Sequence, residues 1–217
     1  MFVGHYGVSF AAKSVDRSIP LWVLFIAVQL LDVIWAPLVL LGIEKVRIVS
    51  GITASNPLDL YYMPYTHGLL AAITWSCLGA LAYGFFFRPA SSRSSVIVGL
   101  AVFSHWILDF IVHRPDLPLY DNSAKVGLGL WNAPAIALSL EALLLFGGIW
   151  LYFRGRLSQS VGTFVLGALM VALQSYLFFG PPPVSDKAAA WSALICYAAL
   201  AGVFWWMQDR KAAIRAS

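Results

Sequence analysis

The chain has few charged residues for its length. Asp, Glu, Lys and Arg make up only 11% of its 217 residues, whereas an ordinary soluble domain carries about 25%. Hydrophobic residues make up 60%, and the mean hydropathy is +0.79. So few charges cannot cover the surface of a soluble protein of this size. The composition therefore excludes a soluble enzyme, a disordered tail and a disulfide-bonded secreted domain, and it predicts an integral membrane protein.

Three further patterns are missing. The only two cysteines, Cys77 and Cys196, lie in apolar stretches without CxxC spacing, which argues against a disulfide framework and a thiolate zinc site. The net charge is +4, but Lys and Arg form no cluster, so nucleic acid is not an expected partner. Residues 1–12 contain no Lys or Arg ahead of an apolar core, so we expect no cleavable signal peptide.

The sequence contains long apolar runs with few or no charged residues. A hydrocarbon core of about 30 Å requires roughly 20 apolar residues for each helical crossing. We therefore predict an all-α fold: residues 1–217 form one polytopic membrane bundle of about six transmembrane helices, preceded by a short interfacial or re-entrant helix. The expected spans are Ile19–Gly42, Tyr65–Phe87, Ser95–His113, Gly127–Phe153, Ser160–Gly180 and Ala188–Met207.

The connecting segments predict an orientation. Cytoplasmic loops carry an excess of Lys and Arg, and the 14 basic residues divide nine to five between the two sides of the predicted bundle. Both termini are on the richer side. We therefore expect the bacterial inner membrane, with both termini cytoplasmic and the loops after spans one, three and five on the opposite side.

Ionisable residues inside the apolar segments are candidates for function, because each costs at least about 2.5–3.5 kcal/mol to insert. The carboxylates are Asp32, Asp109 and Glu141. All four histidines of the chain lie in or beside the first four apolar segments, and they are His5, His67, His105 and His113.

The third span carries a helical His–Asp–His pattern. Because four residues advance a helix by about 400°, the side chains of His105, Asp109 and His113 stack on one face. His67 opens the second span near the same membrane face, and Asp32 comes within reach of His105 if the first three helices pack together. Imidazole and carboxylate suit Zn²⁺, with manganese and iron as poorer choices. The pattern predicts a metal site inside the bundle.

Structural roles compete with this interpretation. A single intramembrane His or Asp is often an interhelical hydrogen-bond partner. His113 lies at a helix end beside Arg114, where it either ligates or faces headgroups. Glu141 fits a proton carrier, a general base or a packing residue equally well, and its spacing does not choose among them.

Four short blocks resemble the YdjM-type family of membrane-bound metal-dependent hydrolases, which is distantly similar to zinc-dependent phospholipase C. "GHYGVSFAAK" resembles the glycine-histidine block and supplies His5, and "YTHGLL" resembles the Thr-His element and supplies His67. "VFSHWILDFIVHRPDLPL" resembles the Ser-His-x-x-x-Asp helix, which assigns His105 and Asp109 to metal-ligand positions. "LLDVIWAPL" places Asp32 at the first carboxylate of the acidic motif.

The likeness covers about the first 120 residues, and the helices within 127–207 carry no recognised motif. Ile34 stands where the family usually has a second aspartate, and Tyr62 and Met63 replace a His-Arg pair. The resemblance implies hydrolysis of a phosphoester in a lipid or lipid-linked substrate by a metal-activated water. From general acid–base chemistry, a carboxylate such as Asp32 or Glu141 would then accept the proton.

Two other classes of function stay open. In a proton-coupled transporter, Asp32, Asp109 and Glu141 would form a relay, although no inverted repeat is evident. In a non-catalytic subunit, the polar residues would bind a lipid, a cofactor or another subunit. The expected partners are membrane lipid, a lipid-like substrate and either a second copy or a membrane complex.

Overall fold

The computed structural model is mostly helical, as predicted. It describes residues 1–154 and 161–216, with side chains in the last helix described as far as residue 206. A two-stranded antiparallel sheet is the only strand pairing of named strands in this part of the chain. The elements are α1 (Val3–Val15), α2 (Leu21–Val28), α3 (Leu30–Leu40), β1 (Lys45–Ile48), β2 (Leu58–Tyr62), α4 (Leu69–Phe86), α5 (Ser92–Val112), η1 (Leu130–Asn132), α6 (Pro134–Phe153), α7 (Val161–Phe179) and α8 (Asp186–Ala216).

Five helices are long and apolar enough to cross a bilayer: α4, α5, α6, α7 and α8 up to Trp206. The pair α2 and α3, bent by 53° at its break, adds a sixth span if it is counted as one. This confirms the predicted architecture. The fourth span begins at Pro134 rather than Gly127, because Gly127 and Gly129 adopt positive φ angles that a helix does not allow. Ser160, the predicted start of the fifth span, lies outside the described residues.

In each of the five helical windows that qualify as spans, fewer than half of the residues are buried inside the protein. Among the windows that qualify as spans, α5 is the most buried and α8 the least. Many of the exposed side chains are large and apolar, including Phe86 and Leu143, which are 76% and 71% exposed. Such surfaces are unfavourable in water and suit a lipid environment. The protein is therefore an integral membrane protein.

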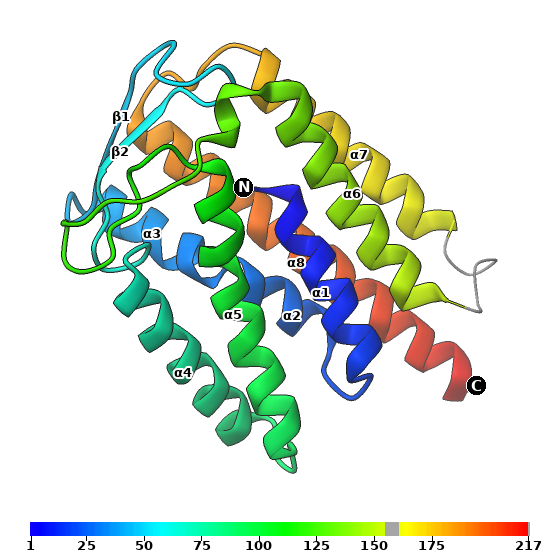
Figure 1. The fold of residues 1–217 in the computed structure, drawn as a ribbon. Helices are drawn as coiled ribbons and strands as arrows, with labels where there is room; N and C mark the ends of the chain where they lie inside the picture. The colour runs from blue at the N-terminus through cyan, green and yellow to red at the C-terminus, as the bar shows by residue number, and fades with distance from the viewer. Residues whose placement is uncertain (155–160, 217) are drawn as a thin grey trace.

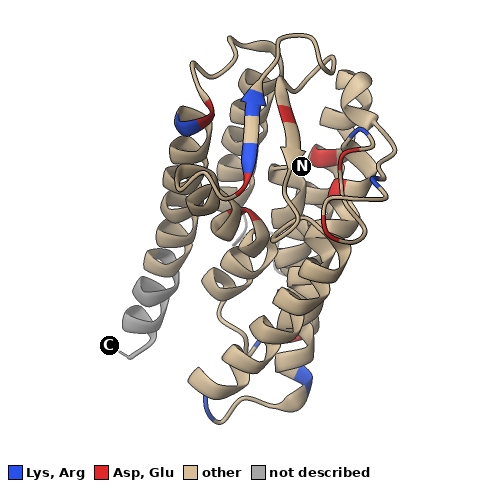
Figure 2. Cartoon of the chain, turned by 90° about the vertical axis from the view of Figure 1, so that its left-hand side faces the viewer, with Lys and Arg blue, Asp and Glu red and all other residues tan. Residues whose placement is uncertain are grey.

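Charged residues gather toward the two ends of the bundle, with mostly uncharged helix between them (Figure 2). One end, here called the hairpin end, contains β1, β2 and the loops after α5 and α7. Which compartment each end faces stays a prediction. Four of the nine basic residues counted at the opposite end lie outside the described residues, wholly or with their side chains: Arg156, Arg210, Lys211 and Arg215.

The amino-terminal helix α1 lies inside the bundle rather than at its interface (Figure 1). It packs most extensively against α6 and also contacts α2, α5 and α7. Glycines permit the close approach: a Cβ added at Gly7 would overlap the backbone of Leu144, and one added at Gly148 would overlap Gly7. His5 is completely buried. The insertion of α1 explains how His5 comes near residues at the hairpin end.

The hairpin end is closed by the segment between α5 and α6. Leu69 and Leu70, at the start of α4, donate backbone hydrogen bonds to Pro118 and Leu119. Gly129 donates to the carbonyl of His113 at 2.6 Å. This segment therefore covers the carboxyl end of α5.

Candidate metal centre

Two overlapping groups of side chains place possible ligand atoms within 4.8 Å of one another. One contains His5, His105 and Asp109, and the other contains Asp32, His67 and His105. The five residues come from α1, α3, α5 and the segment before α4. The structure thus brings together all five residues that the sequence nominates as metal ligands.

The break between α2 and α3 helps to orient His105. It interrupts the helical hydrogen-bond ladder after Val28, and the His105 ring places Nδ1 2.7 Å from the Val28 carbonyl oxygen. Because a carbonyl only accepts, Nδ1 carries the proton in this contact. In the neutral ring Nε2 then holds a lone pair. It lies 3.1 Å from Asp109 Oδ2 and 3.7 Å from Asp32 Oδ1.

A hydrogen-bonded chain orients His67 in the same way. The Thr66 hydroxyl donates to Glu44 Oε2 at 2.6 Å. Its oxygen then accepts from His67 Nδ1, which lies 2.8 Å away. The lone pair of a neutral His67 therefore lies on Nε2, 3.2 Å from Asp32 Oδ1 and 3.7 Å from Asp109 Oδ2.

His113 follows the same arrangement at the carboxyl end of α5. Its Nδ1 lies 2.9 Å from Asp116 Oδ1, and its Nε2 lies 3.4 Å from Asp109 Oδ2. The ring packs against Trp131, with centroids 4.1 Å apart. His113 therefore turns inward beside the two triads instead of facing the headgroups.

Three imidazoles thus direct Nε2 toward Asp32 and Asp109 while an acceptor holds Nδ1. A lone pair facing a carboxylate oxygen is repulsive unless a proton or a cation lies between them. His105 Nε2, though only 3.1 Å from Asp109, has no hydrogen bond within the described chain. A histidine that binds a metal through one ring nitrogen typically has the other nitrogen hydrogen-bonded, as Nδ1 is in these three residues. The donor set, which is imidazole and carboxylate without thiolate, fits a divalent cation such as Zn²⁺.

The insertion of α1 completes one triad. His5 Nε2 is 3.2 Å from Asp109 Oδ1, and neither ring nitrogen has a hydrogen bond within the described residues. The ring stacks on His105, with centroids 4.0 Å apart and planes 3° from parallel. The amino group of Met1 also donates to Asp109 Oδ1 at 2.6 Å. Asp109 therefore lies at the centre of the cluster.

Asp32 connects the cluster to the last helix. Its Oδ2 accepts a 2.6 Å hydrogen bond from the hydroxyl of Tyr197 on α8, so Oδ1 is the oxygen that faces the histidines. The Asp32 side chain is 15% exposed, whereas that of Asp109 is 2% exposed. Asp32 is thus the more accessible of the two carboxylates.

Glu141, the other nominated catalytic carboxylate, belongs to neither triad in the described structure. Its Oε2 accepts backbone hydrogen bonds from Phe2 at 3.0 Å and Gly4 at 3.2 Å. Its Oε1 accepts from Gln174 Nε2 at 2.9 Å. Because unpaired N–H groups at a helix start carry partial positive charge, a carboxylate is favourable there. Glu141 therefore holds the start of α1.

His113 and Glu44, which lie outside the spans, have shifted pKa values. Burial lowers the pKa of His113, but the nearby carboxylates of Asp109 and Asp116 raise it more strongly, to about 9. A proton can then occupy the space between His113 and Asp109 when no cation does. Burial raises the pKa of Glu44, although its contacts with His67, Thr66 and the backbone of Tyr65 act in the opposite direction.

Several residues of the site carried no recognised sequence signal. Glu44 is 1% exposed and Asp116 is 2% exposed, although both come from polar segments between helices. The three-residue spacing from His113 to Asp116 is a hint of their pairing in retrospect. Nothing local in the sequence links Glu44 to Thr66, 22 residues later.

Comparison of the chain with protein-family models, curated proteins and solved structures gives no match. The chain is a multi-span helical membrane protein with buried His/Asp groups that could bind a metal.

Proposed function

We propose that the protein is a membrane-embedded, metal-dependent hydrolase that acts on a phosphoester of a lipid or lipid-linked substrate. The observation that carries the proposal is the convergence of histidine Nε2 atoms on Asp32 and Asp109, with Nδ1 of His67, His105 and His113 held by acceptors. The bundle lies in lipid, and a cavity of about 510 Å³ reaches the cluster.

The ion would be held by His5, His67, His105, Asp32 and Asp109, with Zn²⁺ as the proposed metal. A divalent cation there would polarise the phosphoryl oxygen and lower the pKa of a water molecule toward 7. Hydrolysis forms a bond from the water oxygen to phosphorus and breaks the bond from phosphorus to the leaving oxygen. The proton released by water passes to a carboxylate, and Asp32 is proposed for this role because it borders the cavity.

The chain's other residues prepare the site for this chemistry. The acceptors at Val28, Thr66 and Asp116 fix the histidine rings, so little reorganisation is needed when substrate binds. Tyr197 holds one oxygen of Asp32 and leaves the other directed to the cluster.

Elemental analysis of the detergent-purified protein tests the metal. We expect about one Zn²⁺ or similar ion per chain in the wild type, and loss of that metal in a His105→Ala/Asp109→Ala double variant. Asp16→Ala is the matched control, because the Asp16 carboxylate accepts hydrogen bonds from Ser18 and Ser94 and belongs to neither triad. Size-exclusion profiles check that all three proteins are folded.

Hydrolysis is then tested on p-nitrophenyl phosphate and on phosphoester lipids in mixed micelles. We expect activity that chelation removes and added metal restores. A wild-type protein that binds no metal, even after metal is supplied, would refute the proposal and favour a transporter or a non-catalytic subunit.

A further inference from the structure

The cavity that reaches the cluster has one polar end and long apolar walls. Asp32, His67, Asp109 and His113 line the polar end. Apolar side chains from α7, α8 and the segment between them form much of the rest, including Leu173, Leu177, Phe178, Pro181, Val184 and Ala193. A volume of about 510 Å³ is typical of ligand-binding cavities. The two ends suit an amphiphilic ligand.

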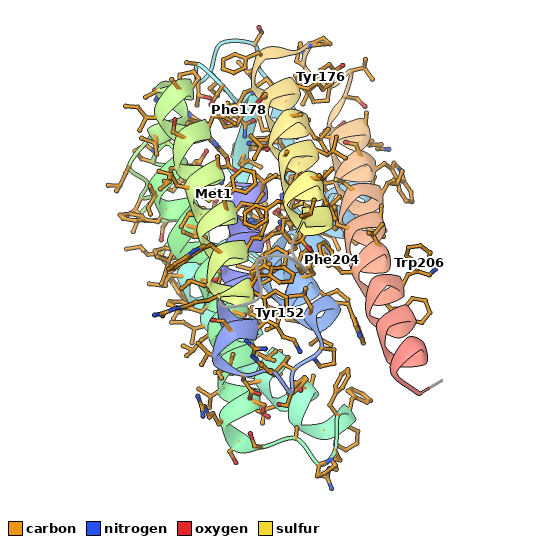
Figure 3. The ribbon with its side chains drawn as sticks, turned by 90° about the vertical axis from the view of Figure 1, so that its right-hand side faces the viewer. Met1, Tyr152, Tyr176, Phe178, Phe204 and Trp206 are labelled. Carbon is orange, nitrogen blue, oxygen red and sulfur yellow. The ribbon has the colours of Figure 1, made fainter. Side chains whose placement is uncertain are left out.

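The apolar walls come from two helices that are consecutive in sequence but pack on different neighbours. α7 packs against α6, whereas α8 packs against α2 and α3. The end of α7 and the beginning of α8 face the viewer in Figure 3, where Tyr176 lies near the α7 end. Tyr176 and Leu177 line the cavity, yet they are 58% and 53% exposed. Both helices qualify as membrane spans, and Tyr176 and Leu177 lie in the last turn of α7, so an opening between the helices would face lipid near the hairpin end.

The face that α8 presents to the cavity carries small side chains. Ala189, Ser192, Ala193 and Cys196 line it at positions i, i+3, i+4 and i+7, which lie on one side of a helix. These small side chains leave room over about 10 Å of helix, at 1.5 Å per residue. The space ends at Tyr197, whose hydroxyl donates to Asp32. A hydrocarbon chain lying along this face would therefore point its head toward the cluster.

One buried polar group without a hydrogen-bond partner among the described residues also indicates a ligand. Trp35 lines the cavity and is 5% exposed, and its indole N–H has no hydrogen-bond partner among the described residues. A buried donor without an acceptor is unfavourable. An oxygen of a phosphoester or of an adjoining ester would satisfy it.

We infer that the substrate is an amphiphilic membrane lipid that reaches the cluster sideways, between α7 and α8, with a hydrocarbon chain along the face of small side chains on α8 and its phosphoester at the His/Asp cluster. The phosphoester part of this inference rests on the proposed function. The lateral path and the chain site rest on the cavity and on the packing of α7 and α8.

Photo-crosslinking in vesicles tests the chain site without relying on hydrolysis. The protein is placed in phosphatidylcholine vesicles containing phosphatidic acid with a diazirine in its acyl chain, and crosslinked peptides are mapped by mass spectrometry. We expect crosslinks within residues 173–178 and 189–197 that decline when unlabelled phosphatidic acid is added. Crosslinks to exposed residues of α4 report bulk lipid and should not decline in this way.

Two bulky substitutions on α8 provide the matched comparison. The Trp ring of Ala193→Trp fills the space beside the cavity-lining face of α8. It should reduce the competed crosslinks, which are those that decline when unlabelled phosphatidic acid is added, about tenfold or more, equivalent to at least about 1.4 kcal/mol of binding. Ala198→Trp places the same ring on the exposed face and should change nothing. Metal content measured in both variants checks that the cluster remains intact.

A second measurement avoids any question of folding in the Ala193→Trp variant. In a Cys77→Ser background, Cys196 is the only cysteine and lines the cavity. A bulky maleimide is attached to Cys196 after the protein has folded. This modification should remove the competed crosslinks, and prior phosphatidic acid should slow the modification.

The outcomes separate this inference from the proposed function. Competed crosslinks that disappear in Ala193→Trp, in a protein without hydrolysis, would support the lateral site while the hydrolase proposal fails. Metal-dependent hydrolysis of p-nitrophenyl phosphate would leave the hydrolase proposal standing. If at the same time the crosslinks to α8 are not competed, or are equal in the two Trp variants, the lateral site is overturned.

Discussion

Replacement of Glu141 separates a positioning role from a catalytic one. Its carboxylate accepts hydrogen bonds from Phe2, Gly4 and Gln174, and the side chain is completely buried. In Glu141→Ala these three donors lose their acceptor, and each buried unsatisfied group costs about 1–3 kcal/mol. With Phe2 only partly buried, we expect a loss of roughly 3–6 kcal/mol in the free energy of unfolding.

Glu141→Gln should be nearly neutral for a specific reason. Its amide oxygen can take the place of Oε2 and accept from Phe2 and Gly4. Its amide nitrogen can donate to Gln174, whose Oε1 has no hydrogen-bond partner among the described residues. This requires only that the Gln174 amide turn over. The remaining loss is the negative charge at the start of α1, which is worth about 0.3–1 kcal/mol.

Thermal unfolding in a fixed detergent and elemental analysis measure the two effects. We expect Glu141→Ala to have a lower Tm and less bound metal, because a frayed α1 no longer presents His5. Glu141→Gln should match the wild type in Tm, metal content and hydrolysis. If Glu141→Gln instead keeps its metal but loses hydrolysis by about 10²–10⁴-fold, Glu141 is a general acid–base residue. Equal destabilisation by Gln and Ala would refute the hydrogen-bond argument.

Two further substitutions test how the cluster is supported. Gly7→Ala adds a Cβ that overlaps the backbone of Leu144, so we expect a loss of about 1–3 kcal/mol in stability and weaker metal retention; Gly147→Ala on α6 has open space around it and should be tolerated in the same thermal-unfolding assay. Thr66→Val removes the hydroxyl between Glu44 and His67 and should weaken metal affinity about 10–100-fold. Thr66→Ser keeps the hydroxyl and should restore most of that affinity in a chelator titration, whereas equal affinity in the Val and Ser variants would contradict the tautomer argument.

The helical architecture was predictable because it depends on local composition. Runs of about 20 apolar residues identify spans wherever they occur. The break between α2 and α3 was not predicted, because the run Ile19–Gly42 is apolar apart from Gln29 and Asp32, and Pro37 lies beyond the break. The hairpin of β1 and β2 was also missed, since short segments between spans give weak periodic signals. These two features lie beside the cluster.

The identity of the candidate ligands was predictable for a different reason. A His or Asp in an apolar segment is costly wherever it points, so its mere presence is informative. The same logic fails for Glu44 and Asp116, because an acidic residue in a polar loop costs nothing until the loop folds inward. It also fails for Glu141, whose intramembrane position is equally costly as a base and as an acceptor for α1.

The cluster therefore depends on long-range packing more than on its short motifs. His67 is oriented by Glu44 through Thr66, and His113 by Asp116. His5 is placed by α1, which approaches α6 through glycines and whose first turn is held by Glu141. Each support lies outside the residues that would touch the ion, and each holds a ring in one tautomer or one position. A substitution in a support should thus change metal affinity gradually, whereas a substitution at His105 or Asp109, which belong to the centre of the cluster, should remove the metal entirely.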